Sequence, residues 1–174
     1  LKRYHSSSDE KSLVQLVRQG GKFAEPLTVT ADDAAQSKEL SEGIYKVEKD
    51  FTTLDQNHPT GHITFYYGNP ATGVQLEKQL TFHADSYVVD VALKPSGVAG
   101  AVKVGLGTNF GVVDWGEGFI GSVGAASLID DKIENDMPES ETERKGSVQW
   151  VALQDKYFIS ALFPKTSVSA FPKK

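Results

Sequence analysis

The chain has 174 residues, a formal net charge of −5 at pH 7 and no cysteine. This length suits one domain, since domains typically have roughly 100–200 residues, and the lack of cysteine excludes disulfides, thiolate nucleophiles and cysteine-ligated metals. An acidic chain without a basic stripe argues against a nucleic-acid binder, and no run approaches the ~18 apolar positions of a membrane span. Because the first residue is Leu1 rather than Met, we expect a piece of a longer protein whose targeting and membrane segments lie outside it.

The N-terminal third predicts one strand and one polar segment. Residues 13–17 fit a helix and a strand equally well by pattern. Leu27, Val29 and Ala31 alternate with threonines, which indicates a strand. The polar segment Asp32–Gly43 is expected to be a surface loop or one short helix.

From Tyr45 onward, alternation and turn residues predict a regular series of strands. Turns are indicated at residues 55–61, Gly68-Asn69-Pro70 and residues 95–100. The clearest hairpin joins two strands through the three turn residues Ala84-Asp85-Ser86. The strands of this series are expected at residues 45–51, 63–67, 74–82, 87–93 and 102–106.

The segment Gly105–Gly124 is rich in glycine, which favours bulges and close backbone approach over a regular ladder. A strand is expected over Ser127–Ile133. The charged segment Asp130–Lys145 is expected to be an exposed loop or an excursion at a strand edge.

The stretch Gly146–Pro164 is the densest apolar segment of the chain. We expect two core strands, divided at Gln154–Asp155. The first is apolar on both faces, which is typical of a strand covered on both sides. In the second, Tyr157, Ile159, Ala161 and Phe163 point one way, and Pro164 ends the ladder because it has no N–H.

No long helical period and no internal repeat is present, and turn signals recur every 8–12 residues or so. This pattern predicts an all-β fold with little helix, an antiparallel β-sandwich formed by residues 1–174 as a single domain.

No constellation of residues points to catalysis, a cofactor or a metal. His58 and His62 have a spacing that could hold a metal on a helix, but Pro59 and Gly61 between them exclude a helix. His83 is expected at the surface, at the hairpin end beside Asp85. We therefore expect no enzyme.

Binding through aromatic side chains has two interpretations. The tyrosines and tryptophans could line a groove for a sugar or a peptide, or they could pack in the core. Core packing is the simpler interpretation for a tryptophan within a strand, whereas a tryptophan flanked by Asp and Gly fits a loop. The residues concerned are Tyr66, Tyr67, Trp115, Phe119 and Trp150.

Two blocks resemble a known family, the large periplasmic domain of the YidC-type membrane protein insertases. The first is Trp150–Pro164, WVALQDKYFISALFP, and the second is Gly73–Leu93, GVQLEKQLTFHADSYVVDVAL. A weaker block at the start, Leu1–Tyr4 followed by Leu13–Val17, occurs in the same order and favours a strand for the latter. The resemblance covers almost the whole chain.

The resemblance implies a supersandwich, two large twisted antiparallel sheets face to face, similar to galactose mutarotase and other aldose epimerases. It implies a non-enzymatic module at the periplasmic side of the bacterial inner membrane, with membrane helices before and after it. The implied partners are nascent membrane proteins and the Sec translocon with its SecDF-type accessory subunits. The residues expected to contact partners, or to form the joint to the membrane region, are Trp115, Phe119, Trp150, Asp155, Lys156, Tyr157 and Phe158.

A different class remains as the alternative: a carbohydrate-binding β-sandwich module of a secreted or periplasmic protein. It would share the fold and use the same aromatic side chains. What flanks the domain discriminates the two, because an insertase domain lies between membrane helices and a sugar-binding module lies beside a signal peptide and catalytic domains.

Overall fold

A computed structural model describes Val17 and residues 25–107, 124–136, 144–154, 158–166 and 168–170. The chain divides into two compact units: the first spans Val29–Val104, and the described residues on either side of it belong to the second. The strand pairings between the described strands are antiparallel, and one helix is present among them. These findings confirm the antiparallel all-β class with little helix. The face-to-face packing of two large sheets stays a prediction.

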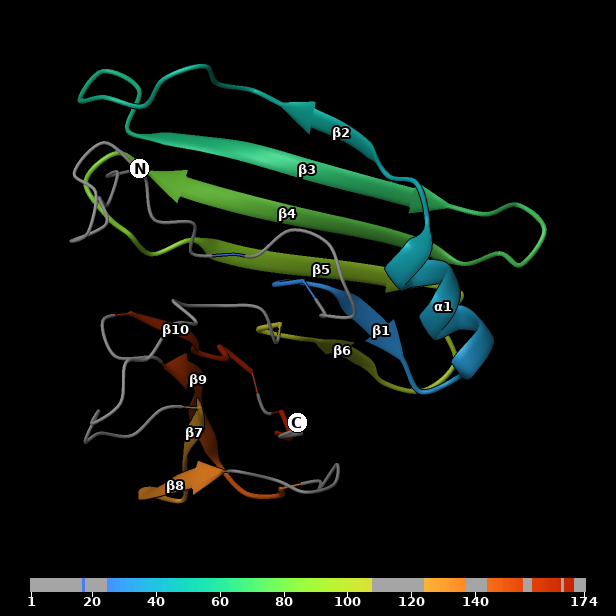
Figure 1. Ribbon diagram of the computed structural model, residues 1–174. Helices are drawn as coiled ribbons and strands as arrows, with labels where there is room; N and C mark the ends of the chain where they lie inside the picture. The colour runs from blue at the N-terminus through green and yellow to red at the C-terminus, as the bar shows by residue number, and fades with distance from the viewer. Residues whose placement is uncertain are drawn as a thin grey trace, which may run out of the picture. The chain divides into compact units, whose positions relative to one another are not determined.

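The first unit contains a four-stranded sheet in the order β2-β3-β4-β5 (Figure 1). Its long central strands are paired from Thr60↔His83 to Gly68↔Gln75, as the alternating pattern of this region predicted. A two-stranded sheet, β1-β6, and the helix α1 complete the unit. The elements are β1 (Val29–Ala31), α1 (Ala34–Glu42), β2 (Lys46–Lys49), β3 (Thr60–Gly68), β4 (Gln75–His83), β5 (Asp90–Ser96) and β6 (Val102–Val104).

The core of the first unit gathers at one end of this sheet, and α1 closes it. The helix is the second of the two alternatives expected for Asp32–Gly43. It starts because the Asp33 carboxylate caps it, accepting a hydrogen bond from the Gln36 backbone N–H at 2.9 Å. The buried cluster, each member at most 7% exposed, consists of Val29, Ala31, Leu40, Val74 and Leu76.

The β4–β5 connection is longer than predicted. The last pair of the ladder is Thr81↔Asp90, so the chain leaves the sheet for residues 84–89 instead of turning at residues 84–86. The backbone N–H of Ala84 donates to the Pro59 carbonyl at 2.8 Å, which ties this loop to the neighbouring β2–β3 connection. The prediction that the strand begins at Tyr87 is wrong: β5 begins at Asp90, and the Val88 N–H donates within the loop to the Ser86 hydroxyl at 3.0 Å instead of to β4.

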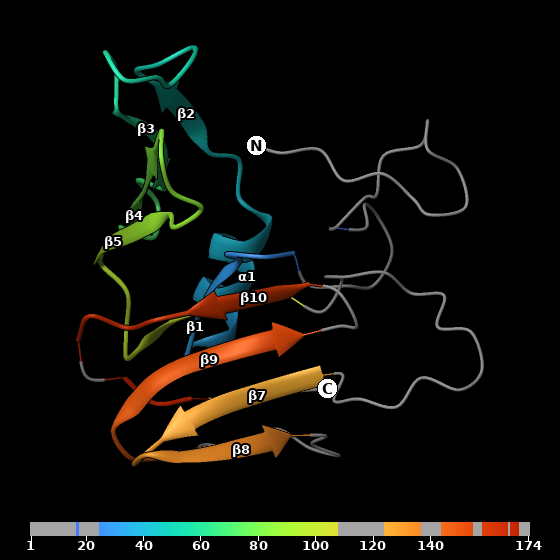
Figure 2. The same ribbon diagram turned by 90° about the vertical axis from the view of Figure 1, so that its left-hand side faces the viewer.

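The second unit contains a four-stranded sheet in the order β10-β9-β7-β8, whose strands lie side by side in Figure 2. The prediction of one strand over Ser127–Ile133 is wrong in its extent, because the chain turns between Ile129 and Lys132. Asp130 and Asp131 adopt positive φ of 49° and 62° and form a two-residue turn, since aspartate tolerates this conformation. The strands are β7 (Gly124–Ile129), β8 (Lys132–Asp136), β9 (Val148–Gln154) and β10 (Ile159–Leu162).

Candidate interaction surfaces

The segment that carries the first family-like block forms the hairpin of β9 and β10. Its register runs from Ile159↔Gln154 to Leu162↔Val151, so the prediction of two strands divided near Gln154 is confirmed. Phe158 lies just before β10 and is half-buried. The other three candidates of this region, Asp155, Lys156 and Tyr157, lie outside the described residues, as do Trp115 and Phe119.

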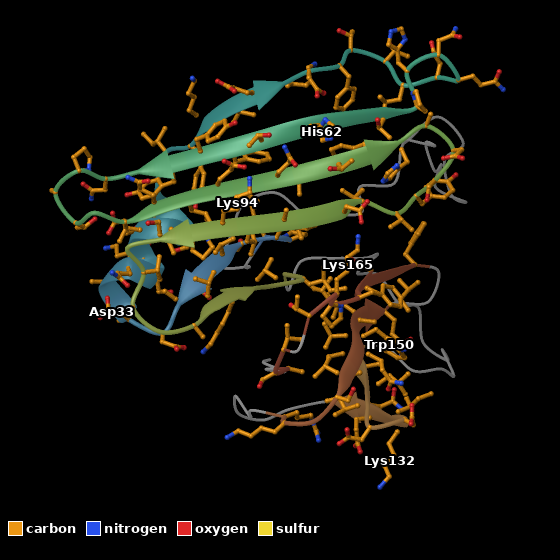
Figure 3. All side chains as sticks on the ribbon, turned by 180° about the vertical axis from the view of Figure 1, so that it is seen from behind. Asp33, His62, Lys94, Lys132, Trp150 and Lys165 are labelled. Atoms are coloured by element: carbon orange, nitrogen blue, oxygen red, sulfur yellow. The ribbon has the colours of Figure 1, made fainter. Side chains whose placement is uncertain are left out.

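Trp150 lies in the middle of β9, opposite Leu128 of β7, and Figure 3 labels it on this sheet. The strand is apolar on both faces, as the sequence indicated, and Ala152 near its centre is 3% exposed. Trp150 and Val151 on either face are half-buried. The described part of the chain therefore leaves a share of the indole surface open to contacts.

The start of β9 is fixed by the turn between β7 and β8. The Asp130 carboxylate accepts a hydrogen bond from the Ser147 N–H at 2.8 Å, and the Gln149 amide donates to the Asp131 carboxylate at 2.6 Å. Gly146 has a φ of +142°, and a Cβ there would lie 2.5 Å from an Asp130 oxygen. The two aspartates thus hold β9 in register with β7, a role that the sequence pattern did not reveal.

The described strands at both edges of this sheet expose large apolar side chains. Ile159 of β10 is 63% exposed, Phe163 directly after β10 is 69% exposed, and Ile133 of β8 is 66% exposed. The prediction of a core strand over this segment is therefore wrong for the face that Ile159 and Phe163 share. Ile133 lies at the edge opposite to Ile159 and Phe163, so these side chains do not form one patch.

The first sheet has one polar and one apolar face. On the apolar face Lys78 interrupts the row of apolar side chains. Its ammonium lies 4.9 Å from the centre of the Phe65 ring and 5.7 Å from that of Tyr45. Burial lowers the pKa of Lys78 and raises the pKa of Tyr45 to about 12. The aromatic faces stabilise the cation where water is partly excluded.

Each histidine of the first unit faces a carboxylate. The His62 ring lies 2.7 Å from Asp50, and the His83 ring lies 2.9 Å from Asp90 rather than beside Asp85 as predicted. His58 lies in the loop, 3.6 Å from Asp55. In the part of the chain that the structure describes, no three histidine or acidic side chains are grouped so as to hold a metal ion.

The described tyrosines do not line a common groove. Tyr66 and Tyr67 are neighbours on β3 and therefore point to opposite faces of the sheet. Tyr67 is directed to the core: its ring lies 5.4 Å from that of Tyr45, and its hydroxyl donates to Glu39 at 2.9 Å. This geometry does not supply the stacked aromatic platform that a sugar-binding site needs.

Comparisons with known proteins agree with this picture. The family model for the YidC periplasmic domain matches residues 1–173. The membrane protein insertase YidC of Maridesulfovibrio salexigens is 27% identical over 109 residues, which cover 58% of this chain and 20% of the relative. The chain thus spans about a fifth of the length of this relative.

No solved structure matches the chain. Within its described residues, no helix has the length and apolar character needed to cross a bilayer. The match over residues 1–173 places the chain in the YidC periplasmic domain family.

Proposed function

We propose that the chain is the periplasmic domain of a YidC-type insertase and that it aids the insertion and folding of inner-membrane proteins as a protein-interaction and structural module. The observation that carries this proposal is the family match over residues 1–173. The domain faces the periplasm, and the bilayer-embedded part of the same protein performs the transfer of client segments. The domain itself has no catalytic role.

The chemistry of the second unit supports a role in protein contacts. The large side chains Ile133, Ile159 and Phe163 are more than half exposed there, and Trp150 is half-buried. Apolar side chains gain free energy when a partner removes them from water, about 25 cal/mol per Å² of buried area. Nascent membrane proteins and the SecDF-type accessory subunits of the Sec translocon are the proposed partners.

A complementation experiment tests this function. Cells depleted of their own insertase would carry either the full-length protein or a variant from which residues 1–173 are removed. In cells that carry the variant, we expect a model inner-membrane protein to fold more slowly in a pulse-chase protease assay. We also expect the accessory Sec subunits no longer to co-purify with the variant. Equal folding rates together with retained co-purification would contradict the proposal, provided that both proteins reach the membrane in equal amounts.

A further inference from the structure

The helix α1 closes the apolar end of the first core with a single large apolar side chain (Figure 1). Its sequence is Ala-Ala-Gln-Ser-Lys-Glu-Leu-Ser-Glu, in which Leu40 is 1% exposed and both alanines are exposed. A helix of nine residues is marginal on its own. The two glutamates of its last turn also oppose the helix dipole, whose C-terminal end is negative. The helix therefore depends on contacts with the rest of the first unit.

Glu39 ties α1 to the strand β3 and to the turn that follows it. One oxygen of its carboxylate accepts hydrogen bonds from the Tyr67 hydroxyl at 2.9 Å and from the Thr72 hydroxyl at 2.7 Å. Hydrogen bonds to an ionised group are roughly twice as strong as those between neutral groups. These two bonds are therefore the strongest polar link between the helix and the strands.

Gln36 ties α1 to the turn after β5. Its amide group donates to the Gly97 carbonyl at 3.1 Å, and its side-chain oxygen accepts from the Ala99 N–H at 2.8 Å. Both bonds are exposed. Water can replace an exposed hydrogen bond at little cost, so this link adds little to the stability of the closed helix.

The neighbouring strands are held in a different way. β3 and β4 form a ladder of nine residue pairs, from Thr60↔His83 to Gly68↔Gln75. Proteins open locally where a segment has few buried apolar contacts and many exposed hydrogen bonds. The helix has both properties, so we expect it to be less stable than the ladder.

We propose that α1 is a lid over the apolar end of the first core, which opens as one unit while β3 and β4 stay paired, and that the ionised Glu39 side chain holds it closed. Opening removes Leu40 from the buried cluster and uncovers its neighbours there. These neighbours, each at most 2% exposed, include Val29, Val74 and Leu76. The inference concerns the first unit alone and does not depend on the function proposed above.

Acid should release the lid through Glu39. The Thr72 hydroxyl is the main cause that holds the pKa of Glu39 below its ordinary value of 4.5, against the opposing effect of desolvation. Bonds from Asn69 and Tyr67 lower this pKa further. Such a carboxyl stabilises the closed state at any pH above 4.5 and loses this effect as the pH falls through its closed-state pKa.

Other titratable groups surround the helix, and they are unchanged in the Glu39 variants below. An altered pH dependence in those variants therefore reports Glu39 itself. Among the described residues these groups are Asp33 at the N-cap, the pair Lys38–Glu42 at 3.9 Å, Tyr45, whose hydroxyl bonds to the Leu40 carbonyl, and Asp32 with Lys103 at 3.3 Å.

Hydrogen–deuterium exchange with mass spectrometry tests the lid in the full-length protein, held in lipid nanodiscs. Peptides that cover residues 34–42 are compared with peptides that cover residues 60–68 and 75–83. The readout is the protection factor, corrected for intrinsic exchange at each pH. We expect the hydrogen-bonded amides of α1 to exchange while the ladder stays protected. Glu39→Ala should lower the protection of α1 by roughly tenfold and leave that of the ladder unchanged.

Two glutamine variants separate the charge of Glu39 from a general effect of the helix. As the pH falls from about 6 to about 4, the protection of α1 should fall in the unsubstituted protein. It should stay nearly constant in Glu39→Gln, whose side chain still accepts hydrogen bonds but has no charge to lose. The matched control is Glu42→Gln in the same turn, where the side chain is 68% exposed. This control should keep the pH dependence of the unsubstituted protein.

Thiol labelling tests whether the core is uncovered, because the chain contains no cysteine. In the full-length protein, with any other cysteines replaced by serine, Val74→Cys places a thiol in the cluster under α1. Thr64→Cys is the matched control, since Thr64 is 6% exposed and lies on the face of β3 opposite to Tyr67. Adding Glu39→Ala should raise the labelling rate of Val74→Cys by the factor seen in exchange and leave that of Thr64→Cys unchanged.

Three outcomes would overturn the proposal. Equal protection of α1 and the ladder would mean that the helix opens only when the whole unit unfolds. A Glu39→Gln protein with the same pH dependence as the Glu42→Gln control would mean that the charge of Glu39 does not hold the lid. Unchanged labelling of Val74→Cys in the Glu39→Ala background would mean that the cluster stays covered.

Discussion

The sheet β2-β3-β4-β5 keeps its apolar side chains on one face, whereas the sheet β10-β9-β7-β8 carries them on both. In the first unit the large side chains Leu40, Val74 and Leu76 are fully buried. In the described part of the second unit the buried apolar residues are mainly alanines, and Ile133 and Ile159 are exposed. A sheet with one polar face suits water on that side. Among the described residues the large buried side chains lie in the first unit, so we expect the larger losses of stability on truncation there.

Truncation of a buried aliphatic side chain in the first sheet and of an exposed one in the second should give the largest difference in stability between the two sheets. Leu76→Ala on β4 should lower the free energy of unfolding by about 2–5 kcal/mol, because it removes a side chain that is 1% exposed and leaves a cavity. Ile159→Ala on β10 should change it by less than about 0.5 kcal/mol, as is usual for surface positions. Urea denaturation followed by circular dichroism measures both, and equal losses would contradict the comparison.

Gly146 beside β9 and Gly68 at the end of β3 differ in the space that a side chain would meet. Gly146→Ala should cost about 1–3 kcal/mol, because its positive φ disfavours a side chain and the new Cβ would meet Asp130 and Ile129. Gly68→Ala at the end of β3 is the control, since its Cβ would meet only a Gln75 carbon at 4.0 Å. Thermal unfolding of both variants decides the point: a Gly146→Ala protein as stable as the control would show that β9 does not depend on this close approach.

Each of the two four-stranded sheets contains one buried hydroxyl among its described side chains, and the two hydroxyls differ in their hydrogen-bond partners. Ser127 of β7 is 4% exposed, and its Oγ has no hydrogen-bond partner in the described structure, whereas the Thr64 hydroxyl accepts a bond from the Gln79 amide at 3.4 Å. Ser127→Ala should therefore raise the free energy of unfolding by about 1 kcal/mol, and Thr64→Val should lower it by about 0.5–1.5 kcal/mol. Opposite signs in denaturant titrations are the expected result; a destabilised Ser127→Ala would show that the hydroxyl is satisfied.

The polar face of the first sheet predicts a small dependence on acid. The backbone N–H and the ring of His62 both bond to the Asp50 carboxylate and lower its pKa below the ordinary value of 3.8. A carboxyl whose pKa is lower in the folded state than in the unfolded state stabilises the fold at any pH above its unfolded-state pKa. This contribution is lost as the pH falls through the folded-state pKa. The melting temperature of the Asp50→Asn variant should therefore fall less than that of the unsubstituted protein as the pH is lowered from about 5. An unchanged pH profile would contradict this contribution.

The sequence predicted the central ladder of the fold well, because alternation over residues 63–67 and 74–82 is a direct consequence of the two-residue period of a strand. It failed where side chains bond to the backbone. The Asp130–Asp131 turn lacks the usual glycine, and the loop at residues 84–89 is held by hydrogen bonds to residues distant in sequence or within the loop.

Burial was the least predictable property of the candidate surface. Ile159 and Phe163 alternate just as Ile63 and Phe65 do, yet the former are exposed and the latter are half-buried. Alternation specifies which side chains share a face, but the elements that cover this face come from elsewhere in the chain. The edge position of β10 therefore emerged only from the strand order.

Membrane fractionation of the native protein that contains this chain tests whether the domain lies on the periplasmic side of a membrane-embedded insertase. An antibody to the domain would follow the protein through an alkaline wash, and protease would be added from the periplasmic side. We expect the protein to stay with the membrane and the protease to cleave the domain. A protein that washes off, or a domain that the protease cannot reach, would contradict its assignment to the periplasmic side of a membrane insertase.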